Sequence, residues 1–386
     1  MGPLKGVRVL EMSNIGPGPF CGMLLADLGA EVLRVDRLAA SDLGFAIDPR
    51  YDLLNRGKQA VAIDLKNPEG IAAVRELAAK ADLLIEGYRP GVMEKLGLGP
   101  DVLLGDNPAL VYGRMTGWGQ AGSYAPMAGH DINYIGAVGA LASIGPKDGV
   151  PIPPLNLVGD FGGGSLYLAM GLLAALLEAR QSGQGQVIDA AMVDGVASLM
   201  TMHLGFLQAG IWQNGRGTNS LDGGSPYYRC YRTNDGHFMA VGAIELRFYG
   251  ILLDRLGLDP ATLPDRENPA EWDRLAGVFE AEFARKSRDQ WIEVFHGSDA
   301  CVTPVYDIEE MATSPIAHER SLFTPADGVM APAPAPRFSR TAPDAPTGTR
   351  NPSAITHESL TAWGIDAGRI GELAAIGVIP AGAPAR

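Results

Sequence analysis

Short runs rich in valine, isoleucine and leucine alternate with segments of helical pattern along the first two hundred residues. The short runs predict strands, and the segments of helical pattern, one of which carries Pro68 near its first turn, predict helices. Strands are expected at residues 6–12, 31–37, 60–65, 82–88 and 109–117, and helices at 18–30 and 67–81. Strand and helix in alternation predict βαβ units on a parallel, Rossmann-like sheet. Residues 162–195 predict a further buried helix, a strand and the beginning of another helix.

The pattern changes beyond residue 200. Residues 214–226 are rich in turn formers, and residues 227–244 predict a hairpin with Asn-Asp-Gly at its turn. A helix is expected to begin at the capping-box pattern Ser287-x-x-Gln290. Residues 331–352 are rich in proline and predicted to be extended, and residues 369–379 predict a last short helix. This second region is expected to be smaller and of mixed α+β class.

Length and charge limit the function. The chain has 386 residues, more than one ordinary core accommodates, so two domains are expected. Its 31 basic and 44 acidic residues give a net charge of −13, which argues against partners such as nucleic acid or an anionic membrane. A small anionic ligand needs only a local basic pocket. No signal-peptide core is expected, and no apolar stretch of membrane-spanning length without interruption; the most apolar run, residues 166–179, predicts a buried helix.

The cysteines and the absence of a metal-binding motif limit the possible functions further. Three cysteines, Cys21, Cys230 and Cys301, stand far apart and form no Cys-x-x-Cys pair, which favours a reducing, cytoplasmic location. Cys21 is better explained as a small buried residue than as a reactive thiol. The sequence has no motif typical of a protein metal site, so no metal is expected.

Two titratable groups stand side by side in an apolar, glycine-containing stretch, at His130 and Asp131 of the sequence GHDINY. A single histidine in such a place is more often a hydrogen-bonded core residue than a catalyst. A second candidate, Asp160, stands directly before the apolar helix in VGDFGGGS, where an aspartate commonly acts as N-cap. The apolar, glycine-rich surroundings are expected to raise the pKa of this carboxyl by desolvation, as an acid working near neutral pH requires.

The first strand and the segment GPGPFCG come close to a dinucleotide-binding fingerprint, with Asp36 near the end of the next strand. The third glycine is displaced by one position, however. Pro17 and Pro19 also occupy the turn where the backbone must approach a pyrophosphate. Nicotinamide binding is therefore a minor alternative.

Several longer motifs, in order along the chain, resemble the family III CoA-transferase superfamily: LKGVRVLEM, LLADLGAEVLRVDR, EGYRPGVMEKLGLGP, GHDINYIG and GQGQVIDAAMVDG. Within it, GYRPG, RMTGWGQ, AGHDINY and PPLNLVGDFGGGS resemble the α-methylacyl-CoA racemases. The resemblance runs from about Leu4 to Ile379, and the joint match of several motifs makes it specific.

The resemblance implies an α/β fold with a Rossmann-like large domain and a smaller α+β domain. It also implies an interlocked homodimer, whose sites lie between the large domain of one subunit and the small domain of its partner. The large, CoA-binding domain is expected at residues 1–200, completed by 330–386. A linker is expected at 201–225 and the small domain at 226–320. Residues 321–352 are then a Pro-rich return connection, and residues 353–386 supply C-terminal helices of the large domain.

The resemblance further implies a reaction. Racemising a 2-methylacyl-CoA means removing the proton α to the thioester and replacing it on the opposite face, which two acid/base groups achieve through an enolate without a cofactor. By resemblance these groups are His130 and Asp160, and Glu245 pairs with the histidine and fixes its tautomer. Glu245 has an alternative explanation as an acidic residue that opens a helix. The amides at the helix start beside Asp160 are expected to hold the enolate oxygen.

For CoA, which is part of the substrate, the resemblance points to basic side chains and to loop backbone. Arg37, Arg89 and Lys95 are sensible phosphate partners, although solvated charges are common at such positions and Lys95 stands where the racemases carry arginine. Asp131 is expected to turn away from His130, toward CoA or the backbone. The full set of expected CoA contacts is Arg37, Ile63, Asp64, Leu65, Lys66, Gly87, Tyr88, Arg89, Lys95, and, in GHDINY, Gly129, Asp131, Asn133 and Tyr134.

Two rival functions use the same residues. In a CoA-transferase on this scaffold, Asp160 attacks an acyl-CoA and forms a mixed anhydride. A non-catalytic acyl-CoA binder needs no pair of titratable groups. The pair of His130 and Glu245, which a transferase does not need, favours the racemase.

Overall fold

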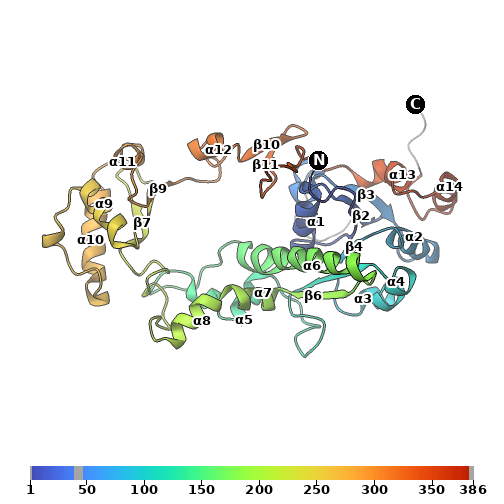
Figure 1. Ribbon diagram of the computed structural model, residues 1–386, viewed down its shortest axis with the longest axis horizontal. Helices are drawn as coiled ribbons and strands as arrows, with labels where there is room; N and C mark the ends of the chain where they lie inside the picture. The colour runs from blue at the N-terminus through green and yellow to red at the C-terminus, as the bar shows by residue number, and fades with distance from the viewer. Residues whose placement is uncertain (1, 39–46, 382–386) are drawn as a thin grey trace. The chain divides into compact units, whose positions relative to one another are not determined.

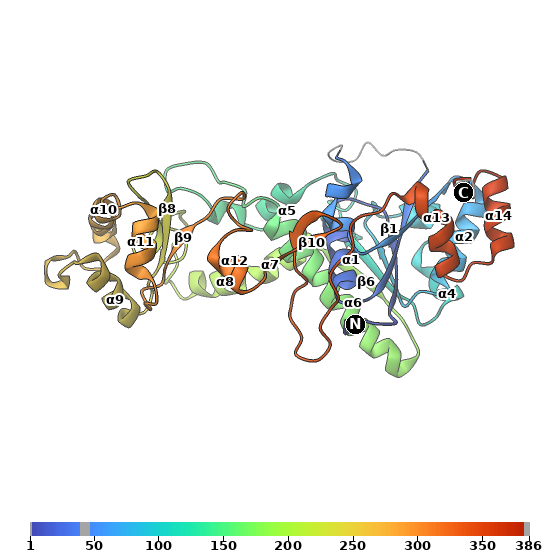
Figure 2. The same cartoon turned by 90° about the horizontal axis from the view of Figure 1, so that it is seen from above.

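The computed structural model describes residues 2–38 and 47–381. The chain forms two compact units, drawn in Figures 1 and 2. The large unit comprises Met1–Val138, Leu155–Leu199 and Glu319–Arg386, and the small unit comprises Gly139–Pro154 and Met200–His318. The small unit therefore includes residues 139–154, which lie within the range predicted for the large domain. It also includes residues 201–225, the expected linker.

A six-stranded parallel sheet forms the centre of the large unit, in the order β3–β2–β1–β4–β5–β6. This confirms the Rossmann-like α/β class. The strands are β1 (Arg8–Met12), β2 (Glu31–Arg37), β3 (Gln59–Ile63), β4 (Leu83–Glu86), β5 (Val111–Thr116) and β6 (Val187–Ala191). The strand order reverses between β1 and β4, and open sheets of this kind bind ligands beyond the carboxyl ends of their strands at such a switch point.

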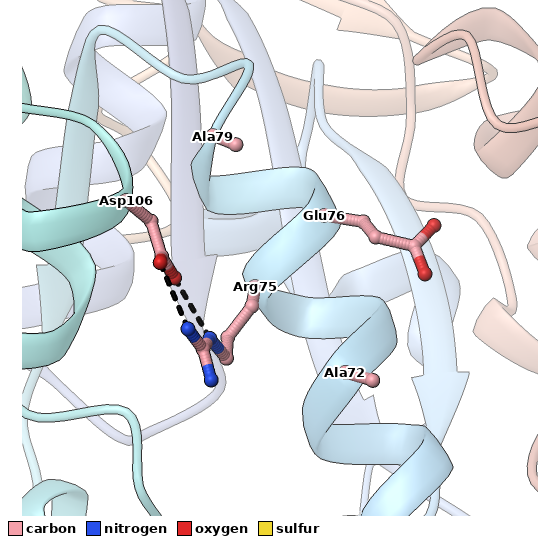
Figure 3. Close-up of a pocket in the computed structure, with 5 residues that line it drawn as sticks. All are labelled: Ala72, Arg75, Glu76, Ala79 and Asp106. Carbon is pink, nitrogen blue, oxygen red and sulfur yellow. Dashed lines mark hydrogen bonds and ion pairs between the residues drawn. The ribbon is translucent and has the colours of Figure 1, made fainter.

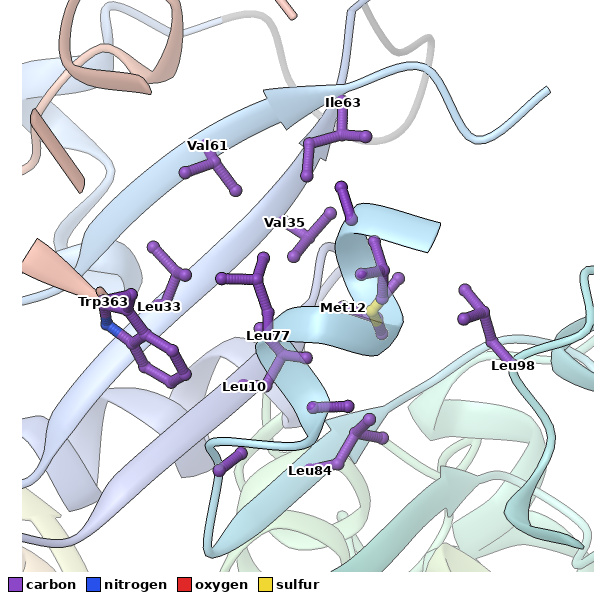
Figure 4. Close-up of a cluster of buried hydrophobic side chains, with 14 of the residues drawn as sticks. Leu10, Met12, Leu33, Val35, Val61, Ile63, Leu77, Leu84, Leu98 and Trp363 are labelled. Atoms are coloured by element: carbon purple, nitrogen blue, oxygen red, sulfur yellow. The ribbon is translucent and has the colours of Figure 1, made fainter. Parts of the chain in front are cut away.

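Helices cover both faces of this sheet. On one face lie α2 (Pro68–Ala78), α4 (Pro100–Asp106), α13 (Pro352–Ala362) and α14 (Ala367–Ala375), and on the other α1 (Pro17–Asp27) and α6 (Leu166–Ser182). Figure 2 shows α13 and α14, in red, beside α2. Side chains alternate along β1, so that Leu10 faces the first layer and Val9 the second. Figure 4 shows the first layer, where Trp363, just after α13, lies beside Leu33.

Two buried ion pairs fix α1 against the sheet. Arg56 donates to Asp27 with 2.6 Å between Nη2 and Oδ2, and Lys58 Nζ lies 2.7 Å from Glu11 Oε2 on β1. Lys58 also donates to the carbonyl of Pro19 in the first turn of α1, at 2.9 Å. Because these charges are buried and fully paired, breaking either pair leaves an isolated charge in the core. The start of α1 therefore has a fixed place at the switch point.

The helical stretch through α6 is longer than the sequence suggested. A π-helical segment, η4 (Leu157–Ser165), runs directly into α6, so residues 157–182 form one apolar helical stretch of 26 residues. Its length and composition suffice for a membrane span, contrary to the expectation that no uninterrupted stretch does. A single helix of this kind is only a weak sign of a membrane, because core helices share these properties. The predicted burial holds for one side: Leu168 and Leu172 are buried, whereas Met170 and Leu177 are 61% and 64% exposed.

The small unit contains a three-stranded antiparallel sheet, β7 (Tyr228–Arg232), β8 (Phe238–Gly242) and β9 (Val302–Val305). The first two strands form the predicted hairpin, closed at its turn by Thr233 donating to the carbonyl of His237. Its helices are α8 (Thr201–Gln208), α9 (Leu246–Leu256), α10 (Trp272–Phe283) and α11 (Arg288–Phe295), and α12 (Pro315–Glu319) follows. Both bonds of the predicted capping box, between Ser287 and Gln290, open α11.

Hydrogen bonds and an ion pair join residues 139–154 to the rest of the small unit, where Lys147 pairs with Asp273 at 3.4 Å. Arg216 donates to the carbonyls of Ala142, Pro146 and Gly149. The remaining elements of the large unit are α3 (Val92–Lys95), α5 (Asp131–Ala137), α7 (Met192–Leu199) and the hairpin β10 (Phe323–Ala326) and β11 (Val329–Pro332). The hairpin precedes the extended Pro-rich segment, which leads to α13.

Candidate active site

His130 is the N-cap of α5, on the chain that follows β5. Its backbone N–H donates to Asn133 Oδ1 at 3.0 Å, and the hydroxyl of Tyr134 donates to the carbonyl of Gly129. Tyr134 is buried edge-on against Trp118. The backbone on either side of His130 is thus held in place, and the His130 side chain is exposed. Of the predicted CoA contacts in this loop, Asn133 and Tyr134 use their side chains to build the loop itself.

Asp131 joins this loop to the segment that carries Asp160. Its side chain is only 5% exposed, and its Oδ2 accepts hydrogen bonds from the backbone N–H groups of Gly159 and Asp160, both at 2.7 Å. Gly159 permits this approach, because a Cβ there would lie 2.5 Å from Oδ2. The two amides are therefore already paired. That the helix start holds the enolate oxygen stays a prediction, and these two amides do not support it.

Asp160 lies within η4, at its fourth residue, and not at a helix N-cap, which is Asn156. The carboxyl is partly buried, and Asn156 Nδ2 donates to Oδ2 at 3.0 Å. Burial raises the pKa of Asp160, the hydrogen bond from Asn156 lowers it, the charge of Asp131 raises it and that of His130 lowers it. The net shift is upward, as the apolar surroundings predicted. His130 and Asp160 thus lie within electrostatic reach of each other.

The first turn of α1 packs directly against η4. The Phe20 and Phe161 rings lie 4.4 Å apart, and Ser165 Oγ donates to the carbonyl of Pro17 at 2.7 Å. A Cβ on Gly16 would lie 3.1 Å from Asp160 Oδ2. The turn after β1, where a dinucleotide fold binds pyrophosphate, is therefore filled by the segment that carries Asp160. This contact disfavours nicotinamide binding and places Asp160 at the switch point of the sheet.

The other predicted CoA contacts follow the carboxyl ends of β2, β3 and β4, at one edge of the sheet. Arg37 ends β2, Ile63 ends β3, and the Gly87–Tyr88–Arg89 stretch follows β4. Burial raises the pKa of Tyr88 and the charge of Arg37 acts to lower it, so two of these strand ends lie close enough to interact.

The exposure of these residues divides them into two groups. Arg37, Lys66, Arg89 and Lys95 are exposed and available to phosphates. Ile63 is buried in the core, Leu65 packs against it, and Asp64 accepts a hydrogen bond from the N–H of Lys66 at 3.0 Å. The side chains of Ile63 and Leu65 therefore belong to the core, and the N–H of Asp64 is bound by the carbonyl of Val378 at 2.9 Å.

Sequence reasoning missed Asn14, which lies between α1 and the loop after β4. Asn14 Nδ2 donates to the carbonyl of Met12 at 2.9 Å. A Cβ on Gly18 or on Gly87 would lie within 3 Å of the Asn14 side chain. Both glycines therefore make room for the same amide. The only sequence signal was its position two residues after a strand that ends at the switch point.

Glu86 and Arg114 hold the loop after β4 in place, a role that the sequence did not reveal. Glu86, the last residue of β4, is 1% exposed and accepts a hydrogen bond from the N–H of Tyr88 at 2.8 Å. Arg114 donates to Glu86 at 3.0 Å and makes a pair of hydrogen bonds to Glu94. Burial outweighs these contacts and raises the pKa of Glu86 to about 7. The turn that carries Tyr88 and Arg89 is thus built on a buried carboxyl.

Glu245 belongs to the small unit, where it is the exposed N-cap of α9. The carbonyl of Ile244, just before it, accepts a hydrogen bond from Arg266 at 2.7 Å. The Arg266 guanidinium lies 4.1 Å from the ring centre of Tyr227 and 4.4 Å from that of Tyr249. The position of Glu245 is therefore well supported within its own unit, and its pairing with His130 stays a prediction.

A surface pocket lies elsewhere on the large unit (Figure 3), lined by Ala72, Arg75, Glu76, Ala79 and Asp106. Arg75 and Asp106 close on each other with two hydrogen bonds, of 2.7 and 2.8 Å. The charges that line this pocket are thus already paired, and none of the predicted site residues lies in it. Within residues 2–38 and 47–381, no group of three histidine, cysteine or acidic side chains is arranged to hold a metal ion.

The chain is similar to known proteins in sequence and in fold. A model of CoA-transferase family III matches residues 4–354. The alpha-methylacyl-CoA racemase of Mus musculus is 47% identical over 92% of this chain and 91% of its own length. That of Homo sapiens is 44% identical over 96% of each chain. The crystal structure of a CAIB/BAIF family protein from Brucella suis has a TM-score of 0.81 at 25% identity, covering 94% of this chain and 99% of the other.

Proposed function

We infer the function from one premise, that the chain belongs to CoA-transferase family III. We propose that it is an α-methylacyl-CoA racemase, an isomerase that interconverts the R and S forms of 2-methylacyl-CoA thioesters. The observation that carries the proposal is the link between the two segments: Asp131, next to His130 at the start of α5, accepts a hydrogen bond from the backbone N–H of Asp160 in η4 at 2.7 Å. The identity of 44–47% to relatives named as racemases supports it.

The proposed reaction is a 1,1-proton transfer. One of His130 and Asp160 takes the proton from the carbon α to the thioester, which leaves a planar enolate, and the other returns a proton to the opposite face. The two groups exchange roles when the other enantiomer is the substrate. Asp160 must therefore hold a proton in one direction and release it in the other. The upward shift of its pKa suits this double role, because it brings the carboxyl closer to working pH.

The CoA moiety is proposed to lie along the carboxyl edge of β2, β3 and β4. Arg37, Lys66 and Arg89 are exposed there and supply positive charge for the phosphates, and Lys95 is a further candidate. The chain as a whole is strongly acidic, with a net charge of −13, so this edge is a local exception. We expect no cofactor, because general acid–base transfer through an enolate needs only the two side chains.

Two further parts of the proposal concern assembly and location. We propose a homodimer in which Glu245 of one chain approaches His130 of the other. The exposed apolar side chains Leu166, Met170 and Leu177 on α6 support a partner surface over this helix. A cytoplasmic location is proposed from the three unpaired cysteines.

The test uses one enantiomer of a 2-methylacyl-CoA in D₂O, with α-deuterium followed by NMR and configuration by chiral analysis. We expect deuterium gain together with loss of optical purity. Replacing either His130 or Asp160 by alanine should reduce both rates by at least about 10²-fold. A control variant, His318→Ala, removes an exposed histidine of α12 and should leave them unchanged.

The transferase alternative predicts a different outcome of the same experiment. Acyl transfer to an added carboxylic acid, without α-exchange and with a hydroxylamine-sensitive acyl group on Asp160, would establish that function instead. A protein that binds acyl-CoA but does neither would be a binding module.

A further inference from the structure

Of the two directions expected for Asp131, toward CoA or toward the backbone, the structure shows the second. We propose that Asp131 is a positioning residue for Asp160, which holds the Asp160 backbone and places a negative charge beside its carboxyl, and that its side chain does not bind CoA. The inference rests on the proposed racemase function and adds a residue to its machinery.

The Asp131 side chain bonds to the protein backbone and not to the surface proposed for CoA. Its side chain lies inside the large unit, and one carboxylate oxygen, Oδ2, accepts the N–H groups of both Gly159 and Asp160. The other oxygen, Oδ1, is buried and has no hydrogen-bond partner among the described residues. A group in this position cannot reach a ligand at the sheet edge. It does fix the two peptide units from which the Asp160 side chain projects.

The unpaired oxygen gives the arrangement its electrostatic consequence. A buried carboxylate without a cationic partner disfavours a second negative charge beside it, so it favours the protonated form of Asp160. The titratable groups that α5 and its cap turn toward Asp160 are His130, Asp131 and Tyr134. From α1 the facing residues, Gly16 and Phe20, are uncharged. Asp131 is thus the one negative charge among these groups, and His130 acts in the opposite direction.

The charge and the hydrogen bonds can be removed separately. In Asp131→Asn the amide oxygen still accepts both N–H groups, but the charge is lost. In Asp131→Ala both are lost. We expect Asp131→Asn to move the acidic limb of the kcat/KM profile for α-exchange to lower pH by about one pH unit, because Asp160 then ionises more readily. Asp131→Ala should lower kcat by about 10²-fold through misplacement of Asp160.

Binding measurements separate this role from a CoA contact. A positioning residue should leave the KM for acyl-CoA and the Kd for free CoA within about twofold of the wild type, whereas a lost contact weakens both. The matched control is Asp82→Asn. Asp82 also accepts a backbone N–H, that of Arg8, at 2.7 Å, but it precedes β4 at the opposite edge of the sheet. This variant should leave the pH profile unmoved.

The possible outcomes test the role of Asp131 separately from the proposed racemase function. Absence of α-exchange in the wild type overturns the racemase itself. If the wild type exchanges the α-proton but the acidic limb of Asp131→Asn stays in place or moves to higher pH, only the role of Asp131 is overturned. A weakened Kd for CoA at unchanged kcat returns Asp131 to the CoA contacts. Because Asp131→Asn keeps the size and the acceptor of the side chain, it carries the test even where the alanine variant is unstable.

Discussion

Asn156 donates its side-chain amide to Asp160 across one turn of the same π-helical segment, with 3.0 Å between Nδ2 and Oδ2. The carboxyl that we assign to proton transfer is therefore bound by a donor on its own segment, while Asp131 acts on it from another. The hydrogen bond favours the ionised carboxylate, whereas the charge of Asp131 disfavours it. The two neighbours pull the protonation of Asp160 in opposite directions.

Asn156→Ala tests this opposition. Without the donor, the pKa of Asp160 should rise, and the acidic limb of the kcat/KM profile should move to higher pH by roughly half to one unit. This is the reverse of the direction expected for Asp131→Asn. The measurement is α-exchange in D₂O across pH, with Asn67→Ala, which removes the half-buried N-cap of α2, as the control. Movement of both variants in one direction would refute the opposition.

Mixed dimers test where Glu245 acts. If Glu245 serves His130 of the partner chain, co-expression of His130→Ala with Glu245→Gln chains produces a mixed dimer with one intact site and one doubly damaged site. Its racemase activity should then be about half that of the wild type, whereas either homodimer stays impaired by the 10²–10⁴-fold typical of a lost acid–base group. Mixed dimers as inactive as the single variants would place both residues in one chain.

Gly87→Ala tests the packing at the switch point. The new Cβ would meet the Asn14 side chain at 2.9 Å, and because Asn14 is held by the carbonyl of Met12, the loop that carries Tyr88 and Arg89 should shift. We expect the Kd for CoA to weaken about tenfold, the effect of roughly 1.4 kcal/mol.

Two further variants identify the cause of that weakening. Gly105→Ala, in α4 with open space at its Cβ, is the control and should leave the Kd unchanged. The double variant Asn14→Ala, Gly87→Ala should regain part of the affinity, because the clash is removed. If the single variant binds CoA like the wild type, this packing does not position the loop.

Glu86 predicts a pH dependence of stability. Burial raises its pKa from 4.5 to about 7 in the folded protein, so between these values the folded chain keeps a proton that the unfolded chain has released. This stabilisation is complete below about pH 4.5 and is lost as pH rises through 7, a change on the order of 3 kcal/mol. Glu86→Gln keeps the acceptor for Tyr88 and Arg114 but removes the titration. Urea unfolding at pH 5 and pH 7.5 should therefore show a smaller loss in Glu86→Gln than in the wild type.

Glu94→Gln is the matched control for that measurement. Glu94 also pairs with Arg114, but its side chain is 44% exposed, and the pair lowers its pKa. A carboxyl whose pKa is lowered by folding stabilises the fold at pH values above its unfolded pKa, and this stabilisation is lost as the pH falls. Glu94→Gln should therefore change the pH dependence of stability in the opposite sense to Glu86→Gln. Equal pH slopes in wild type and Glu86→Gln would mean that Glu86 is ionised in the folded state.

The sequence predicted most of the large unit because its signals are local. The strands from β1 to β6 are short apolar runs, and Pro68, placed after Asn67, marks the start of α2, as expected. Elements that depend on tertiary packing were missed, such as α5, a helix of seven residues held by Asp131 and Tyr134. The π-helical form of η4 was missed for the same reason.

The candidate site shows the same division. Sequence motifs indicated His130 and Asp160, and the structure connects their segments through the side chain of Asp131. The uses of Asn14, Asn156 and Glu86 depend on contacts between segments far apart or on a turn that no periodicity encodes. Buried polar side chains of this kind carry no sequence signal, because asparagine and glutamate occur mostly on surfaces.

The return of the chain to β3 has a consequence for how the molecule is made. Thr356 of α13 accepts the N–H of Ala62, the carbonyl of Val378 accepts that of Asp64, and Trp363 fills the core beside β2. A growing chain on the ribosome therefore cannot complete the sheet face that α13 covers until almost the whole chain has emerged. The small unit has been synthesised entirely by then. If two copies interlock, as the family resemblance implies, this delay gives them a period in which one nascent or newly released chain can thread through another before either fold is complete.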